Sequence, residues 1–278
     1  MSEAPAKFEG LLQRVRSALI LLPFVVAPVF FGGWLFALLL AVVGFLMARE
    51  WTNLLKAPAG DGVTLGVTVM LLLAFGLMLS PIDAIMLMVV ACFACASYCF
   101  ALGKRLSPLV GGLVYVALPL LAAQFLRLDP LGVFLIGYLL ISVWAVDIFA
   151  MFSGKIIGGP KLAPTISPKK TWAGLIGGMV GAVLAAILSF FTLVGFGFGQ
   201  MSFTAVIIIA PLLAICSQIF DLFESAIKRR YDMKDSGVLI PGHGGLLDRV
   251  DGLIGVLAIA LLITAWRGGA ASQALWIW

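Results

Sequence analysis

Hydrophobic residues occupy long, nearly uninterrupted runs along the whole chain, and Gly, Pro or charged residues separate one run from the next. Runs of about 15–25 apolar residues have the length that a helix needs to cross the hydrocarbon core of a bilayer. The pattern therefore predicts an all-α, polytopic integral membrane protein with about nine transmembrane helices. The expected spans are Ser17–Phe31, Trp34–Met47, Leu65–Leu79, Ile82–Ala101, Pro108–Phe125, Leu131–Phe152, Trp172–Val194, Phe203–Ile227 and Val250–Trp266.

Charge placement predicts how these spans are oriented. With the N-terminus in the cytoplasm, every Lys and Arg except Arg127 and Arg267 falls on the cytoplasmic side. Such a bias is typical of bacterial inner-membrane proteins, and here it requires the N-terminus inside and the C-terminus outside. The first two spans then form a hairpin that turns at Gly32-Gly33. The net charge of +5 reflects this bias and does not indicate a nucleic-acid partner.

Composition agrees with lipid as the main solvent, because 63% of the residues are hydrophobic, only 11% are charged and the mean hydropathy is +1.16. A soluble domain carries about 25% charged residues. We expect residues 1–16 to form a cytoplasmic N-terminal segment, since no small-residue cleavage site follows the first apolar run. We divide the remainder into an N-terminal transmembrane region, 17–126, and a C-terminal transmembrane catalytic region, 127–278. The four cysteines have no charged or His neighbours, so we interpret them as packing residues.

All acidic residues from Asp147 onward lie in two stretches, Asp147–Thr171 and Asp221–Asp251. Asp147 lies inside the sixth expected span, where an ionisable group is costly and usually functional. The run Ser167-Pro168-Lys169-Lys170-Thr171 predicts a helix start, with Ser167 as the cap. Free amides at such a point, together with two lysines, suit phosphate oxygens.

The second stretch contains a polar stripe on an otherwise apolar span. Asp221, Glu224, Ser225 and Lys228 recur at helical spacing and must avoid lipid. Glu224 and Lys228 suit a structural ion pair, whereas Asp221 suits an oxygen ligand for Mg²⁺.

A glycine-rich turn follows, in which His243 precedes two glycines, and Asp248 and Asp251 then come at a helix start. Glycines let backbone amides approach phosphate closely, and His243 and Arg249 add donors.

The runs 225–229, 234–237 and 239–251 together resemble the signature of the phosphatidate cytidylyltransferases, also called CDP-diacylglycerol synthases. The Ser167–Thr171 run, the chain length and the many spans are similar to that family too. The resemblance is strongest over the second half of the chain. Three positions depart from the family pattern, where Phe220, Ala173 and Met151 replace the usual Gly, Glu and Tyr, and these affect the expected cleft geometry without removing an expected ligand.

The resemblance implies transfer of a CMP unit from CTP to phosphatidic acid, with release of pyrophosphate, at the cytoplasmic face. It also implies a metal centre in which Asp221 and Asp248 hold the cations, with Mg²⁺ expected and a second cation allowed. The expected catalytic residues are Asp221, Asp248, Lys228, Arg249 and His243. The expected substrate-binding residues are Ser167, Lys169, Lys170, Thr171, Ser225, Arg229, Lys234, Gly244 and Gly245. The expected auxiliary residues are Asp147, Glu224, Asp235 and Asp251.

An ion-coupled secondary transporter is the main alternative, because intramembrane Asp147 and Asp221 also suit cation sites. The lack of an internal repeat and the gathering of polar residues at one membrane face favour the enzyme. A CDP-alcohol phosphotransferase is disfavoured, because its DGxxAR…GxxxDxxxD pattern does not occur. The sequence leaves open whether the chain forms a homodimer, which acyl chains it prefers and whether it distinguishes CTP from dCTP.

Overall fold

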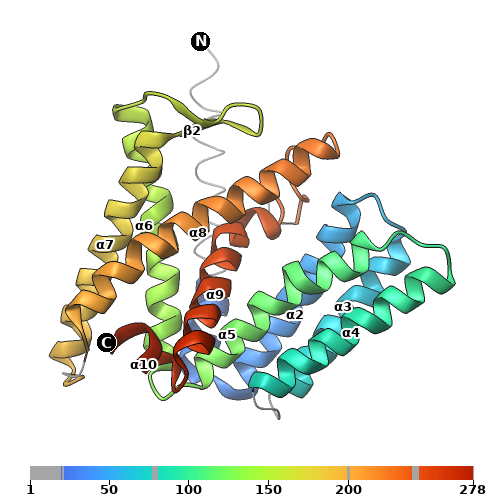
Figure 1. The fold of residues 1–278 in the computed structure, drawn as a ribbon, viewed down its shortest axis with the longest axis horizontal. Helices are drawn as coiled ribbons and strands as arrows, with labels where there is room; N and C mark the ends of the chain where they lie inside the picture. The colour runs from blue at the N-terminus through green and yellow to red at the C-terminus, as the bar shows by residue number, and fades with distance from the viewer. Residues whose placement is uncertain (1–19, 21, 77–80, 199–200, 240–243, 278) are drawn as a thin grey trace. The chain divides into compact units, whose positions relative to one another are not determined.

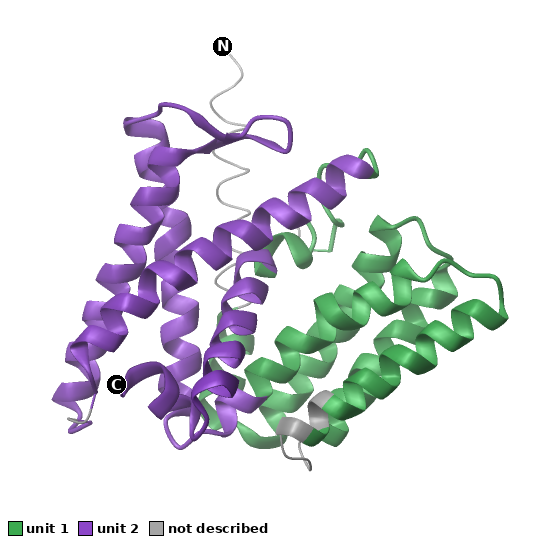
Figure 2. Cartoon of the chain, viewed as in Figure 1, with its two compact units in different colours: residues 1–124, 231–250 green, residues 125–230, 251–278 purple. Residues whose placement is uncertain are grey.

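The chain is almost entirely helical in the computed structural model, which describes residue 20 and residues 22–76, 81–198, 201–239 and 244–277 (Figure 1). It divides into two compact units (Figure 2). Unit 1 comprises residues 1–124 and 231–250, and unit 2 comprises residues 125–230 and 251–278. The second polar stretch of the sequence is therefore divided between the two units.

Seven helical segments in the described residues are long and apolar enough to cross a membrane, which confirms the all-α membrane fold. They are α2 (Gly33–Leu54), α3 (Ala59–Gly76), the segment Ser107–Leu128, α6 (Gly132–Ile156), α7 (Trp172–Gly195), α8 (Phe203–Arg230) and α9 (Leu247–Arg267). Two shorter apolar helical stretches, Leu22–Phe31 and Met86–Ala101, coincide with the other two expected spans; the second lies in α4 (Pro81–Ala101). Nine crossings with the N-terminus inside remain a prediction.

Unit 1 is built around the antiparallel pair α2 and α3. Gly32 and Gly33 have φ of 67° and 54°, so the chain breaks its helix there, at the expected position. Helix α2 continues past Met47 to Leu54, and Arg49 is thus helical instead of lying in a connecting loop. The segment Ser107–Leu128 begins with two π-helical turns, η1 (Ser107–Gly111) and η2 (Leu113–Ala117), before α5 (Leu118–Leu128). These wider turns bring the Pro108 carbonyl within 3.1 Å of the Trp51 indole nitrogen, which donates to it.

Unit 2 contains α6, α7, α8 and most of α9, followed by the short helix α10 (Ala271–Trp276). Helix α7 meets α6 through glycines at 174, 177, 178 and 181, which form two interleaved GxxxG patterns. A Cβ at Gly181 would lie 2.7 Å from the Ala145 carbonyl oxygen of α6. In lipid, where the hydrophobic effect does not press helices together, such small residues allow the close backbone approach that holds a pair.

The predicted helix start at Ser167 is wrong. Ser167–Thr171 forms strand β2, which pairs antiparallel with β1 (Lys161–Ala163), and α7 begins only at Trp172. The cap is Thr171, whose hydroxyl oxygen accepts a hydrogen bond from Gly174 N at 3.0 Å. Pro168 suits the first turn of a helix, but its fixed φ is equally suited to a short edge strand.

Candidate active site

Charged side chains gather at one end of unit 2. Helix α6 ends there, α7 begins there after the β hairpin and α8 ends there (Figure 1). This antiparallel succession brings together residues that are far apart in the sequence. Six of the charged residues in this region are called the acidic cluster: the carboxylates Asp147, Asp221, Glu224 and Asp251 and the lysines Lys170 and Lys228.

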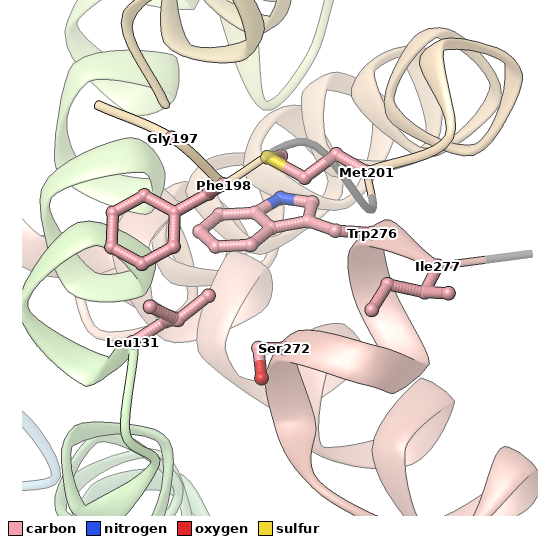
Figure 3. Close-up of a pocket in the computed structure, with 7 residues that line it drawn as sticks. All are labelled: Leu131, Gly197, Phe198, Met201, Ser272, Trp276 and Ile277. Atoms are coloured by element: carbon pink, nitrogen blue, oxygen red, sulfur yellow. The ribbon is translucent and has the colours of Figure 1, made fainter. Parts of the chain in front are cut away.

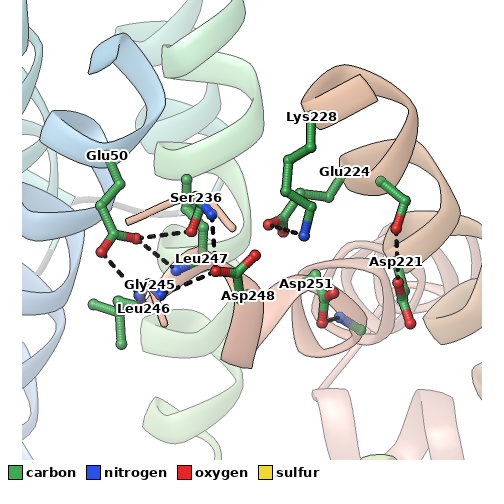
Figure 4. A network of polar contacts seen from close by, with 12 residues as sticks. Glu50, Asp221, Glu224, Lys228, Ser236, Gly245, Leu246, Leu247, Asp248 and Asp251 are labelled. Carbon is green, nitrogen blue, oxygen red and sulfur yellow. Dashed lines mark hydrogen bonds and ion pairs between the residues drawn. The ribbon is translucent and has the colours of Figure 1, made fainter. Parts of the chain in front are cut away.

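Asp221 contacts a lysine from the β hairpin. The Lys170 Nζ atom lies 2.5 Å from Asp221 Oδ2. The Ser225 hydroxyl, one turn further along α8, donates to Asp221 Oδ1 at 3.4 Å (Figure 4). The structure thus brings together three residues that the sequence predicted for the site, although Lys170 comes from a strand and not from a helix N-terminus.

The predicted pair Glu224 and Lys228 is confirmed, with Lys228 Nζ 3.2 Å from Glu224 Oε1 (Figure 4). The Glu224 side chain is fully buried and the Lys228 side chain is 11% exposed. A pair on the helix surface contributes only tenths of a kcal/mol. Burial makes this pair a fixed part of the helix packing, because either charge would be costly to bury alone.

Asp251 connects α9 to the cluster. It lies close enough to Asp221, Glu224 and Asp147 for their negative charges to act on its carboxyl group. Its own Oδ1 accepts a hydrogen bond from Gly252 N at 2.7 Å. Gly252 has no room for a side chain, since a Cβ there would approach Ser217 Oγ of α8 at 2.5 Å. Asp251, an expected auxiliary residue, therefore belongs to the cluster.

Asp248 organises a backbone loop in unit 1. Its Oδ2 accepts hydrogen bonds from Ser236 N and Gly245 N, both at 2.9 Å (Figure 4). Gly244 has φ of 86°, which favours glycine. The helix start expected near Asp248 is confirmed, because α9 begins at Leu247.

Glu50 is a site residue that sequence reasoning missed. The residue is 7% exposed, and its carboxylate accepts hydrogen bonds from Leu246 N, Leu247 N and the Ser236 hydroxyl (Figure 4). A glutamate at the end of an apolar span reads as part of a cytoplasmic loop. Helix α2 continues beyond the apolar run to Leu54, and this continuation is what places Glu50 on a helix instead of in a loop.

A hollow of about 310 Å³ lies beside Glu50 in unit 1. Its lining residues are Leu46, Arg49, Glu50, Asn53, Ser236, Gly237, Val238 and Leu239. A second hollow, of about 230 Å³, lies at the end of unit 2 opposite the acidic cluster and is shown in Figure 3. Its lining residues are Leu131, Gly197, Phe198, Met201, Ser272, Trp276 and Ile277. The apolar character of this second hollow contrasts with the charged end of the same helices.

The other expected site residues are dispersed. Arg229 is exposed and its Nε donates to the Ile166 carbonyl at 3.4 Å. Lys169, Lys234, Asp235 and Arg249 are exposed, whereas Thr171 is buried as the cap of α7. His243 lies outside the described residues. Within the described part of the chain, no group of three or more His, Cys, Asp or Glu side chains is arranged to hold a metal ion.

Comparison with known proteins gives one consistent result. The model of the cytidylyltransferase family matches residues 12–266. The phosphatidate cytidylyltransferase of Brucella abortus (strain 2308) is 38% identical over 261 residues, covering 92% of this chain and 94% of that protein. The phosphatidate cytidylyltransferase of Rickettsia conorii is 32% identical over 253 residues, covering 90% and 89%. The similarity therefore extends beyond the signature into the first five spans, and the chain belongs to the cytidylyltransferase family.

Proposed function

We propose that the chain is a phosphatidate cytidylyltransferase, which converts CTP and phosphatidic acid into CDP-diacylglycerol and pyrophosphate. The observation that carries this proposal is the 38% identity to enzymes of that name over 92% of the chain. The acidic cluster supports it, because nucleotidyl transfer needs cationic groups and carboxylates at one place. The seven candidate spans explain how a lipid substrate reaches such a place, since its acyl chains remain in the bilayer.

The proposed divalent cation would be held by one or two carboxylates of the acidic cluster and by the phosphates of the substrate. The cluster contains four carboxylates, and its two lysines pair with Asp221 and Glu224. Mg²⁺ prefers one or two carboxylates together with substrate phosphates. We propose that Asp221 holds Mg²⁺ and that Asp147 and Asp251 assist. The family resemblance adds Asp248 as a second metal-holding residue; its pairing with Asp221 remains a prediction, because these two residues belong to different compact units.

A bound Mg²⁺ would supply charge neutralisation on the triphosphate. In the reaction, a phosphate oxygen of phosphatidic acid forms a bond to the α-phosphorus of CTP. The bond from that phosphorus to the bridging oxygen breaks, and the electron pair leaves with pyrophosphate. Because the attacking oxygen is already anionic, no protein nucleophile is required.

The chain's own residues would position the substrates and offset developing charge. Lys170 is placed beside Asp221 and could exchange this carboxylate for a phosphate oxygen when CTP binds. The side chains of Lys169, Arg229 and Arg249 are exposed, so turning toward a phosphate that arrives from solution carries no cost for leaving the protein interior. We place this site at the cytoplasmic face, where the positive-inside bias and the supply of CTP agree.

The decisive experiment uses the purified full-length chain in lipid nanodiscs with phosphatidic acid. We expect CDP-diacylglycerol formation with CTP, none with ATP in its place, and loss of activity with EDTA. Asp221→Asn and Asp248→Asn should each lower turnover by about 100-fold or more. Unchanged unfolding temperatures would assign these losses to chemistry.

Two results would contradict the proposal. Turnover that persists in both variants would overturn the metal assignment. Transport of an ion across sealed vesicles, without any CDP-diacylglycerol, would instead favour the secondary transporter.

A further inference from the structure

Glu50 is a buried carboxylate that neutral donors satisfy. Oε1 accepts from Leu246 N at 2.9 Å, and Oε2 accepts from Leu247 N at 2.8 Å and from Ser236 Oγ at 3.3 Å. Among the described residues, no lysine or arginine forms an ion pair with it. Burying a carboxylate is costly unless hydrogen bonds replace its water. This arrangement therefore calls for a role that an apolar side chain could not fill.

Two of the three donors to Glu50, the amides of Leu246 and Leu247, come from the start of α9, 196 and 197 residues later in the chain. The first amides of a helix have no partner within the helix and carry its positive dipole end. A carboxylate from α2 supplies that partner, which determines where the first turn of α9 begins. Asp248 is the next residue after Leu247, so its backbone position follows from the same two hydrogen bonds.

Ser236 connects Glu50 directly to Asp248. Its hydroxyl donates to Glu50 Oε2, and its backbone amide donates to Asp248 Oδ2. The glycines at 237 and 245 leave room for this contact, because a Cβ on Gly237 would lie 2.8 Å from Glu50 Oε1 and one on Gly245 would lie 2.9 Å from Oε2. Two glycines of the family-like signature are thus explained by a residue from the first half of the chain.

We infer that Glu50 is a positioning residue for cytidylyl transfer: it holds the loop at Ser236 and the first turn of α9 so that the Asp248 carboxylate has one orientation. The inference rests on the proposed function insofar as Asp248 serves the reaction. Glu50 acts through hydrogen bonds and touches neither substrate nor reacting atoms. Partners that orient metal ligands in this way typically change metal affinity by about 10–100-fold when they are removed.

Glu50→Gln tests the inference with little change in volume. A glutamine has only one side-chain oxygen to accept hydrogen bonds. Its NH₂ group must therefore face either the Leu246 amide or the Leu247 and Ser236 donors, and the hydrogen bonds on that side are lost. The matched control is Asp61→Asn, which alters another buried carboxylate of unit 1, one that pairs instead with Lys104 at 2.6 Å. Both variants are studied as full-length chains in nanodiscs. The readouts are the Mg²⁺ concentration for half-maximal rate, kcat and KM for CTP, and hydrogen exchange at residues 244–248 without metal.

We expect Glu50→Gln to raise the required Mg²⁺ concentration by about tenfold, to lower kcat more than it raises KM, and to accelerate exchange at Leu246 and Leu247. Asp61→Asn should leave all three unchanged. The inference is overturned if Glu50→Gln shows the same hydrogen exchange and the same Mg²⁺ dependence as the wild type. It is also overturned if Asp61→Asn changes these quantities as much as Glu50→Gln does.

If Glu50→Gln does not insert into the membrane, Ser236→Ala decides, because it removes only the hydroxyl donor. A smaller shift in the same direction supports positioning, and no shift in either Mg²⁺ dependence or exchange refutes it. A wild-type chain without CTP-dependent activity would contradict the proposed function, while the exchange measurement would still report on the role of Glu50.

Discussion

Alanine at position 245 is expected to inactivate the protein by a steric route that the structure defines. A Cβ on Gly245 would collide with Ser236 Oγ and would lie 2.7 Å from Gly237 N and 2.9 Å from Glu50 Oε2. Cβ atoms essentially never approach other atoms closer than 3.0 Å. The serine hydroxyl can rotate away, but the backbone nitrogen cannot, so the loop itself must move.

Movement of the loop endangers two hydrogen bonds to carboxylates. These are Gly245 N to Asp248 Oδ2 at 2.9 Å and Ser236 Oγ to Glu50 Oε2 at 3.3 Å. A hydrogen bond to a charged group contributes roughly 1.5–3 kcal/mol, so losing both costs roughly 3–6 kcal/mol. A loss of about 3 kcal/mol lowers the ratio of ordered to displaced loop by about 100-fold. Turnover should fall by as much as this factor.

The matched control is Gly60→Ala in the first turn of α3, where a Cβ would meet nothing within 4 Å. Removing a glycine from a helix stabilises it by roughly 0.5–1 kcal/mol, so this variant should keep full activity. The assay is CDP-diacylglycerol synthesis in nanodiscs, together with hydrogen exchange of the loop. Full turnover and wild-type exchange in Gly245→Ala would show that the loop tolerates displacement, and the reasoning would fail.

Two further predictions concern stability. Gly181→Ala should destabilise the α6–α7 pair by about 1–3 kcal/mol, because its Cβ would lie 2.7 Å from the Ala145 carbonyl oxygen. The control is Gly137→Ala, whose Cβ would have no other atom within 4 Å. Equal unfolding temperatures of the two variants in micelles would contradict the packing argument. The hydrogen bond to buried Asp61 raises the pKa of Lys104. The Lys104–Asp61 pair therefore stabilises the folded protein fully below the ordinary lysine pKa of about 10.4, and this stabilisation is lost as the pH rises through the raised pKa. We therefore expect the unfolding temperature of the wild type to fall above about pH 10.4 and that of Lys104→Met to change less. If the unfolding temperatures of the two proteins fall in parallel with pH, the prediction is refuted.

The sequence predicted the helices well because lipid imposes a simple rule. Each backbone segment in a bilayer must satisfy its own hydrogen bonds, so a long apolar run has little alternative to a helix. Seven of the nine expected spans correspond to apolar helices of membrane-spanning length in the described residues, and the other two overlap shorter apolar helices. The charged pair of Glu224 and Lys228 was equally predictable, because helical spacing places residues four apart on one face.

Polar segments at the ends of the helices were harder to interpret. Ser167-Pro168 has the residues of a helix start, yet pairing with Lys161–Ala163 makes it a strand and moves the cap to Thr171. Local preferences of this kind are worth about 1 kcal/mol, and pairing with another segment easily outweighs them.

The sequence by itself determined the membrane class, the approximate positions of the helices, the family and most of the ionisable residues that gather at one end of unit 2. Only the tertiary structure revealed that Glu50 joins the Ser236 loop and the start of α9, and that the second polar stretch contributes to two compact units. The physical reason is that helix formation depends on residues a few positions apart. Satisfying a buried carboxylate depends instead on which distant amides the fold brings to it, and no local pattern records that choice.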